Sequence, residues 1–120
     1  MGTAKVIIER RQHPRVKLAV PVVAKTNRKL ITGTTNDISA GGAFICCQRP
    51  LKSGEVFELL ISASLRSLPI RAIAEVVRSH ASCPDNEIEP HGMAVQFIII
   101  SDADRSLISS VVSNHSTNSL

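Results

Sequence analysis

Aromatic residues are almost absent from this chain of 120 residues, which contains no Trp, no Tyr and only three Phe. Its core must therefore be built from Val, Ile, Leu and Ala, and β-branched side chains favour strands. Proteins that bind single-stranded nucleic acid usually stack the bases on aromatic side chains. Phe44, Phe57 and Phe97 all stand at positions expected in a core. The sequence therefore argues against a nucleic-acid partner.

Cysteine is also scarce, and its spacing does not suggest a metal site. Cys46 and Cys47 are adjacent, so on a strand their side chains would point to opposite faces, while Cys83 precedes a proline in an expected loop. Zinc sites usually take their ligands in repeated pairs, which the cysteines and histidines of this chain do not provide. We therefore expect reduced, structural thiols and no bound metal.

Targeting segments and catalytic motifs are missing as well. Within residues 1–11 the only apolar run is Val6–Ile8, which is far shorter than the core of a signal peptide, and no stretch is long enough to span a membrane. We expect a cytoplasmic protein with no membrane insertion. There is no glycine-rich phosphate loop with a following Lys, no dinucleotide-binding glycine pattern and no nucleophile elbow, so we expect no enzyme activity.

What the sequence does contain is a series of short alternating segments. From Val16 to Val23, apolar residues recur with a period of two, which predicts a half-buried strand with Pro21 at an edge or a bulge. A second strand is predicted over 30–38, with a bulge or sharp curvature at Gly33. Further strands are predicted over 43–47, 55–61, 68–79 and 92–100, with polar turns between them.

The pattern changes after residue 100. Ser101 can cap a helix whose first turn carries two aspartates, where the helix dipole favours acids. Apolar side chains then recur at helical spacing, and we expect the helix to fray near Asn114. Short strands followed by one helix predict an all-β barrel or sandwich with a C-terminal helix. We divide the chain into an N-terminal arm (1–15), the β domain with its helix (16–114) and a polar tail (115–120).

Basic residues outnumber acidic ones by 14 to 10, which favours an anionic partner, and they crowd near the N-terminus. Pro14 disfavours a helix there, so Arg10, Arg11 and Arg15 are expected on a loosely held, extended segment. A guanidinium group matches phosphate oxygens and also the O6 and N7 atoms of guanine. Taken alone, the segment is better explained as a solvated basic arm.

A second candidate element is the segment Asp37-Ile38-Ser39-Ala40-Gly41-Gly42. Asp37 and Ser39 are two residues apart at a strand end, so we expect their side chains on the same side. A carboxylate can accept from the N1–H and N2–H groups of guanine. Gly42 allows a close backbone approach to a ligand or a positive φ. A turn that closes a hairpin explains the same residues.

Together, the two elements resemble the PilZ domain family. Arg11 and Arg15 match its R-x-x-x-R motif within the longer match Glu9–Val16, and Asp37, Ser39 and Gly42 match its D-x-S-x-x-G motif. The segments Ala74-Glu75-Val76-Val77-Arg78 and Gly92-Met93-Ala94-Val95-Gln96-Phe97 resemble later strands of the family. These matches extend across most of residues 9–105.

The resemblance implies a six-stranded antiparallel β-barrel with an appended helix, and a bacterial receptor for cyclic di-GMP. In the family, the two arginines bind phosphate and guanine edges, the Asp and Ser hold a guanine, and the Gly permits the turn. These roles fall on Arg11, Arg15, Asp37, Ser39 and Gly42. A long polar residue just before the first motif arginine, here Arg10, is associated in the family with two stacked ligand molecules.

The resemblance also implies how such a receptor signals. Ligand phosphates would order the arm against the barrel, and the new surface or a shifted terminal helix would then meet an effector protein. Two alternatives remain open. One is a PilZ-like adaptor that binds a protein and no nucleotide, and the other is a small basic barrel that binds single-stranded nucleic acid.

Overall fold

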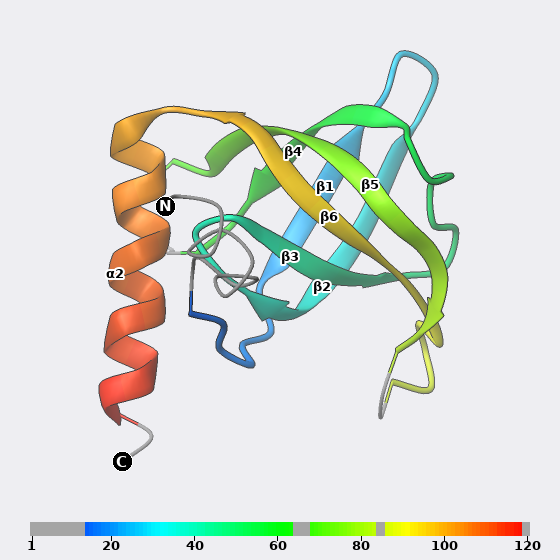
Figure 1. The fold of residues 1–120 in the computed structure, drawn as a ribbon. Coiled ribbons are helices and arrows are strands. Elements are labelled where there is room, and N and C mark those ends of the chain that lie inside the picture. The colour runs from blue at the N-terminus through cyan, green and yellow to red at the C-terminus, as the bar shows by residue number, and fades with distance from the viewer. Residues whose placement is uncertain (1–13, 64–67, 84–85, 119–120) are drawn as a thin grey trace, which may run out of the picture.

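Within residues 14–63, 68–83 and 86–118, which the computed structural model describes, six antiparallel strands close into a barrel. The order around the barrel is β1-β2-β3-β6-β5-β4, and β1 pairs with β4 to close it. A helix, α2, stands against one end of the barrel (Figure 1). This confirms the barrel with a C-terminal helix. The elements are β1 Pro21–Lys25, β2 Leu30–Ile38, β3 Gly42–Cys47, β4 Val56–Ile61, β5 Ile70–Ser82, β6 His91–Ile100 and α2 Asp102–Asn118.

Aliphatic side chains fill the interior of the barrel, as the scarcity of aromatic residues requires. The period of two in β4 and β5 is confirmed, because alternate side chains in each strand are buried. Complete burial of a large aliphatic side chain is worth about 1.5–3 kcal/mol. The buried rows therefore hold the strands in register. They are Phe57, Leu59 and Ile61 in β4, and Ile70, Ala72, Ala74 and Val76 in β5.

The prediction of a regular strand over Val16–Val23 is wrong for its first half. The expected burial is present at Val16 and Val20, but regular pairing with β2 begins only at Pro21. Before that, the chain is held by an isolated bridge between Val16 and Ile38 and by the side chain of Thr35. The period of two correctly identifies the side chains that are buried, but it does not identify the hydrogen-bond partners of the main chain.

Two predicted irregularities are placed differently. Pro21 is the first residue of β1, a position where the missing amide donor is tolerated. Gly33 pairs regularly with Val22, and the bulge in β2 lies instead between Thr35 and Asp37. Gly33 is needed for another reason, because a Cβ atom there would lie 2.6 Å from the carbonyl oxygen of Cys46. Gly33 therefore marks a point where β2 lies very close to β3.

Helix α2 begins as predicted and ends later. The amide of Asp104 donates to Ser101 Oγ at 3.1 Å, which is the expected N-cap. Ile108 and Val112 are buried in the core cluster, whereas Leu107, expected on the same face, is 43% exposed. The helix continues to Asn118 rather than fraying near Asn114. Two buried residues one turn apart therefore attach the helix to the barrel.

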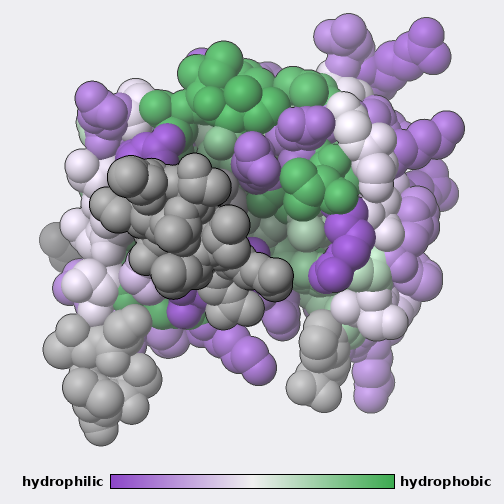
Figure 2. All heavy atoms as spheres, in the orientation of Figure 1, coloured by the Kyte–Doolittle hydropathy of each residue, from purple (hydrophilic) through white to green (hydrophobic). Residues whose placement is uncertain are grey.

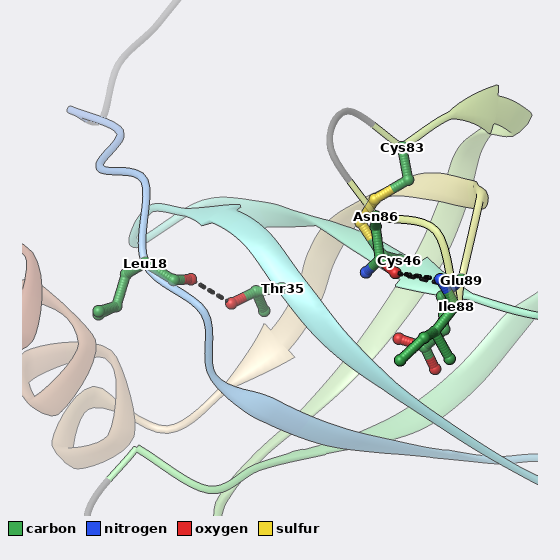
Figure 3. The surroundings of a disulfide bond; sticks show 7 residues. All are labelled: Leu18, Thr35, Cys46, Cys83, Asn86, Ile88 and Glu89. Carbon is green, nitrogen blue, oxygen red and sulfur yellow. Dashed lines mark hydrogen bonds between the residues drawn. A yellow bond between two sulfur atoms is a disulfide. The ribbon is translucent and has the colours of Figure 1, made fainter.

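The expectation of three reduced thiols is wrong, because Cys46 and Cys83 form a disulfide (Figure 3). Their Cα atoms are 5.8 Å apart although the residues are separated by 37 positions in sequence. Both lie near the start of β6: Cys46 pairs with Gly92, and the amide of Cys83 donates to the carbonyl of Pro90. Spacing along the chain cannot reveal this contact, which depends on how β3 and β5 flank the same strand.

Cys47 points away from the disulfide and is fully buried in the core. Burial, together with the charge of Glu89, raises the pKa of its thiol to about 11. A thiol with that pKa is protonated at neutral pH and is a poor nucleophile. The expectation of an inert structural thiol therefore holds for this cysteine.

The surface is mixed in character. Figure 2 shows apolar side chains gathered over the upper part of the barrel, and charged and polar side chains over much of the remaining face. The exposed apolar residues of β6 are Ile98 and Ile99, at 45% and 64%. Among the described residues, no helix is both long and apolar enough to cross a membrane.

We predict that reduction of the disulfide lowers stability. The bond links residues 37 positions apart, and in the chain-entropy model a loop of that size contributes roughly 3–4 kcal/mol. Urea unfolding of the protein should therefore shift to a lower midpoint with dithiothreitol. The Cys83→Ser variant should match the reduced protein and show no response to the reductant. Identical wild-type midpoints with and without reductant would show that the tether contributes nothing.

Candidate functional site

The first pair of candidate site residues meets at the end of β2. Val16 and Ile38 exchange two main-chain hydrogen bonds, of 3.1 and 3.0 Å, and this bridge sets the residue before Val16 next to the end of the strand. As a result, Arg15 Nη1 lies 3.9 Å from Asp37 Oδ1. The two side chains are 51% and 21% exposed, so both remain open to solvent. The structure thus brings together one residue from each sequence motif.

Thr35, which the sequence pattern did not single out, holds the segment that carries Arg15. Its Oγ1 accepts a hydrogen bond from the amide of Val20 at 2.9 Å and donates to the carbonyl of Leu18 (Figure 3). The amide of Thr35 also donates to the carbonyl of Val20 at 2.9 Å. Only 3% of Thr35 is exposed. The available signal in the sequence was a polar Thr on the same side of the strand as the apolar Ile31. A polar group buried there must find a hydrogen-bond partner.

The bulge next to Thr35 affects where Asp37 lies. The pairing of β2 with β3 changes from Thr35 opposite Ile45 to Asp37 opposite Phe44, so Asn36 is the extra residue. Bulges bend a strand and redirect its side chains, and they are frequent beside functional sites. Asp37 therefore reaches its place near Arg15 through an irregularity that the sequence pattern did not locate.

Ser39 closes the turn between β2 and β3. Its Oγ accepts hydrogen bonds from the amides of Gly41 at 3.1 Å and Gly42 at 3.2 Å, and it lies 3.3 Å from the carbonyl of Gly42. The residue is 6% exposed. The turn explanation of this residue is therefore correct. In this state the hydroxyl stabilises the hairpin, while the carboxylate of Asp37 remains the more accessible group.

One sequence expectation for Gly42, a positive φ, is wrong, whereas a close backbone approach to a ligand stays a prediction. Among the described glycines, only Gly54 has a positive φ, and a Cβ atom on Gly42 would lie 2.3 Å from the carbonyl oxygen of Val95. The backbone at Gly42 therefore comes close to the backbone of β6. Gly42 is required so that β3 can start against β6.

The site therefore has two layers with different chemistry. The inner layer is the Ser39–Gly42 turn, in which the hydroxyl of Ser39 is bonded to the amides of Gly41 and Gly42. The outer layer is the Arg15–Asp37 pair, which offers a planar set of donors beside a carboxylate that only accepts. Such a pair can bind a ligand that carries both anionic oxygens and adjacent N–H donors. Arg10 and Arg11 lie outside the described residues.

Comparison with protein families places these motifs in context. The model of the PilZ domain matches residues 9–114, which covers both motifs, the whole barrel and most of α2. No curated protein sequence matches the chain significantly.

Solved structures share the fold. The Bacillus subtilis inhibitor of motility, MotI/DgrA, superposes with a TM-score of 0.77 at 24% identity over 91% of this chain. The chain spans 52% of that protein, about half its length. The PilZ domain of YcgR from Escherichia coli, solved with c-di-GMP, has a TM-score of 0.72 at 13% identity and covers 92% of this chain and 94% of its own. MrkH, described as a c-di-GMP-dependent transcription regulatory factor, has a TM-score of 0.71 at 18% identity, over 90% of this chain and 52% of its own.

We predict that Thr35→Val loosens the segment that carries Arg15. Valine keeps the shape of the side chain but leaves the Val20 amide and the Leu18 carbonyl without this partner, and each such buried group costs about 1–3 kcal/mol. Unfolding in urea should register the loss, and hydrogen exchange at Val20 should accelerate. The matched control is Thr32→Val, at an exposed position of the same strand, which should change stability by less than about 0.5 kcal/mol. Equal effects of the two substitutions would contradict an anchoring role for Thr35.

Proposed function

The chain belongs to the PilZ domain family, and from that premise we propose that it is a receptor for cyclic di-GMP. Members of this family are receptors and adaptors rather than enzymes, in agreement with the lack of catalytic motifs. The observation that carries the proposal is the meeting of Arg15 with Asp37 at 3.9 Å, directly beside the Ser39–Gly42 turn. Cyclic di-GMP offers two phosphates and two guanines to such a pair.

The outer layer of the site suits both parts of this ligand. Arg15 can donate two parallel hydrogen bonds to phosphate oxygens or to the O6 and N7 atoms of a guanine. Asp37 can accept from the N1–H and N2–H groups of a guanine, a pair of adjacent donors that the other common bases lack. YcgR, which shares this fold, was solved with c-di-GMP. These features support a guanine-reading role for Asp37 and a phosphate- or guanine-binding role for Arg15.

The interaction energies favour replacement of the Arg15–Asp37 ion pair by hydrogen bonds to the ligand. An exposed ion pair is worth only about 0–1 kcal/mol, and Arg15 is 51% exposed. Each hydrogen bond to a charged ligand group contributes about 1.5–3 kcal/mol. The ligand therefore replaces the Arg15–Asp37 contact at small cost. We propose that this rearrangement is the event that an effector protein detects.

The motif extends the proposed site beyond Arg15 and Asp37. Arg11 supplies the second motif guanidinium, and Arg10 favours binding of two stacked ligand molecules. Ser39 contributes its hydroxyl to a guanine at the expense of its bonds within the turn. Gly42 contributes through the close packing of β3 against β6, which sets the position of the turn.

A PilZ-like adaptor that binds a protein without a nucleotide is the second candidate. It is the less economical one, because such an adaptor has no need for Arg15 and Asp37 to be adjacent and open to solvent. Binding of cyclic di-GMP separates the two, since only the receptor requires it.

We predict that Arg15→Ala weakens binding of cyclic di-GMP by about ten- to a hundredfold, because one or more charge-assisted hydrogen bonds are lost. Asp37→Ala should weaken it comparably, and isothermal titration calorimetry measures both. The same titration should give a stoichiometry of two ligand molecules per chain.

The matched control is Arg28→Ala, which removes the same charge from an exposed position between β1 and β2, at the opposite end of β2. Its affinity should stay within about twofold of the wild type, because a distant exposed charge is screened. GTP in excess should not compete. Unchanged affinity in Arg15→Ala, or an equal loss in Arg28→Ala, would contradict the assignment of the site.

A further inference from the structure

Arg105, near the start of α2, contacts the turn of the candidate site. Its Nη1 donates a hydrogen bond to the carbonyl of Ala40 at 3.4 Å. Ala40 lies between Ser39 and Gly41 in the turn and is 7% exposed. The two residues are 65 positions apart in sequence. The contact therefore joins the C-terminal helix directly to the turn that belongs to the D-x-S-x-x-G motif.

The carbonyls of Ala40, Gly41 and Gly42 accept hydrogen bonds from three different donors. The carbonyl of Gly41 accepts from the amide of Phe97 at 2.9 Å, and the carbonyl of Gly42 accepts from the amide of Ser39 at 2.9 Å. These two bonds tie the turn to β6 and to itself. The carbonyl of Ala40 has the guanidinium of Arg105, in α2, as its donor. Its position therefore depends on the helix.

The part of α2 that carries Arg105 is well fixed. Asp104 Oδ2 accepts a hydrogen bond from the amide of Arg71 in β5 at 3.2 Å. One turn further on, Ile108 is 1% exposed, and it belongs to the same core cluster as Ala40. A rigid base lets a long side chain hold its target with less loss of conformational freedom on contact. Arg105 is thus a fixed donor aimed at the turn.

We propose that Arg105 is a positioning residue for the ligand site and that it couples the occupancy of that site to α2. The proposal rests on the receptor function proposed above. By holding the Ala40 carbonyl, Arg105 sets the turn whose amides bind Ser39 Oγ, and so keeps the end of β2 ready to receive a guanine. A ligand that draws Ser39 or Asp37 toward itself strains or releases the bond to Arg105 and changes how firmly α2 is held.

Linkage makes this coupling reciprocal. If the ligand alters the stability of the docked helix, the docked helix alters the affinity for the ligand by the same factor. The element that responds is then α2, whose outer side is open to a partner at Ser106, Ser109 and Ser110. The signal is therefore carried by α2.

The test compares hydrogen exchange and ligand affinity in Arg105→Ala, in Arg105→Lys and in the wild type. Without ligand, Arg105→Ala should exchange the amides of Gly41 and Gly42 several-fold faster, because the turn has lost a restraint. Its affinity for cyclic di-GMP should fall roughly three- to tenfold. Arg105→Lys keeps a charged donor and should recover most of both losses. The charge-matched control, Arg28→Ala, should alter neither.

The coupling has its own readout. In the wild type, cyclic di-GMP should change the exchange rates of α2 amides, and in Arg105→Ala that change should disappear while the ligand still binds at higher concentration. An undiminished α2 response in the variant would overturn the coupling. Unchanged exchange at Gly41 and Gly42 would overturn the positioning role. If the wild type binds no cyclic di-GMP, the receptor function fails, and the ligand-free exchange still decides whether Arg105 positions the turn.

Discussion

The hydrogen bonds of the turn from Ser39 to Gly42 hold β2, β3, β6 and α2 at one point of the barrel. Ser39 Oγ binds the amides inside the turn, Phe97 binds it from β6, and Arg105 binds it from the helix. The turn can come this close to β6 only because Gly42 has no side chain. The positions of Asp37 and, through the Val16–Ile38 bridge, of Arg15 follow from where this turn lies.

The strength of each contact decides which parts of the site can change. Ser39 and Ala40 are buried and the turn is held by hydrogen bonds, so disturbing it leaves polar groups unsatisfied at a cost of about 1–3 kcal/mol each. The Arg15–Asp37 ion pair is open to solvent and is worth at most about 1 kcal/mol. A ligand can therefore take the ion pair apart easily, whereas it moves the turn only by making comparably strong contacts of its own. The site combines an exchangeable outer layer with a stable inner one.

Much of this architecture could be predicted from the sequence, because alternating burial depends on local side-chain character. The strand over 30–38 and the buried rows of β4 and β5 are examples. The hydrogen-bonding role of Thr35, the Cys46–Cys83 bond and the contact of Arg105 with Ala40 could not be predicted. Each of these joins segments far apart in the chain, and which segments meet is set by barrel closure and by the bulges that shift its register. The motif residues were found by their spacing, but the close packing of Gly42 against β6 was not predicted.

The central claim is that cyclic di-GMP binds where Arg15, Asp37 and the turn meet. Titration of the isotope-labelled protein with the ligand, followed by the backbone amide resonances, tests it most directly. The account predicts saturable shifts that are largest at Arg15 and from Asp37 to Gly42, with smaller shifts in α2 near Arg105. Shifts centred on the loop between β1 and β2, or no saturable shift at millimolar ligand, would contradict it.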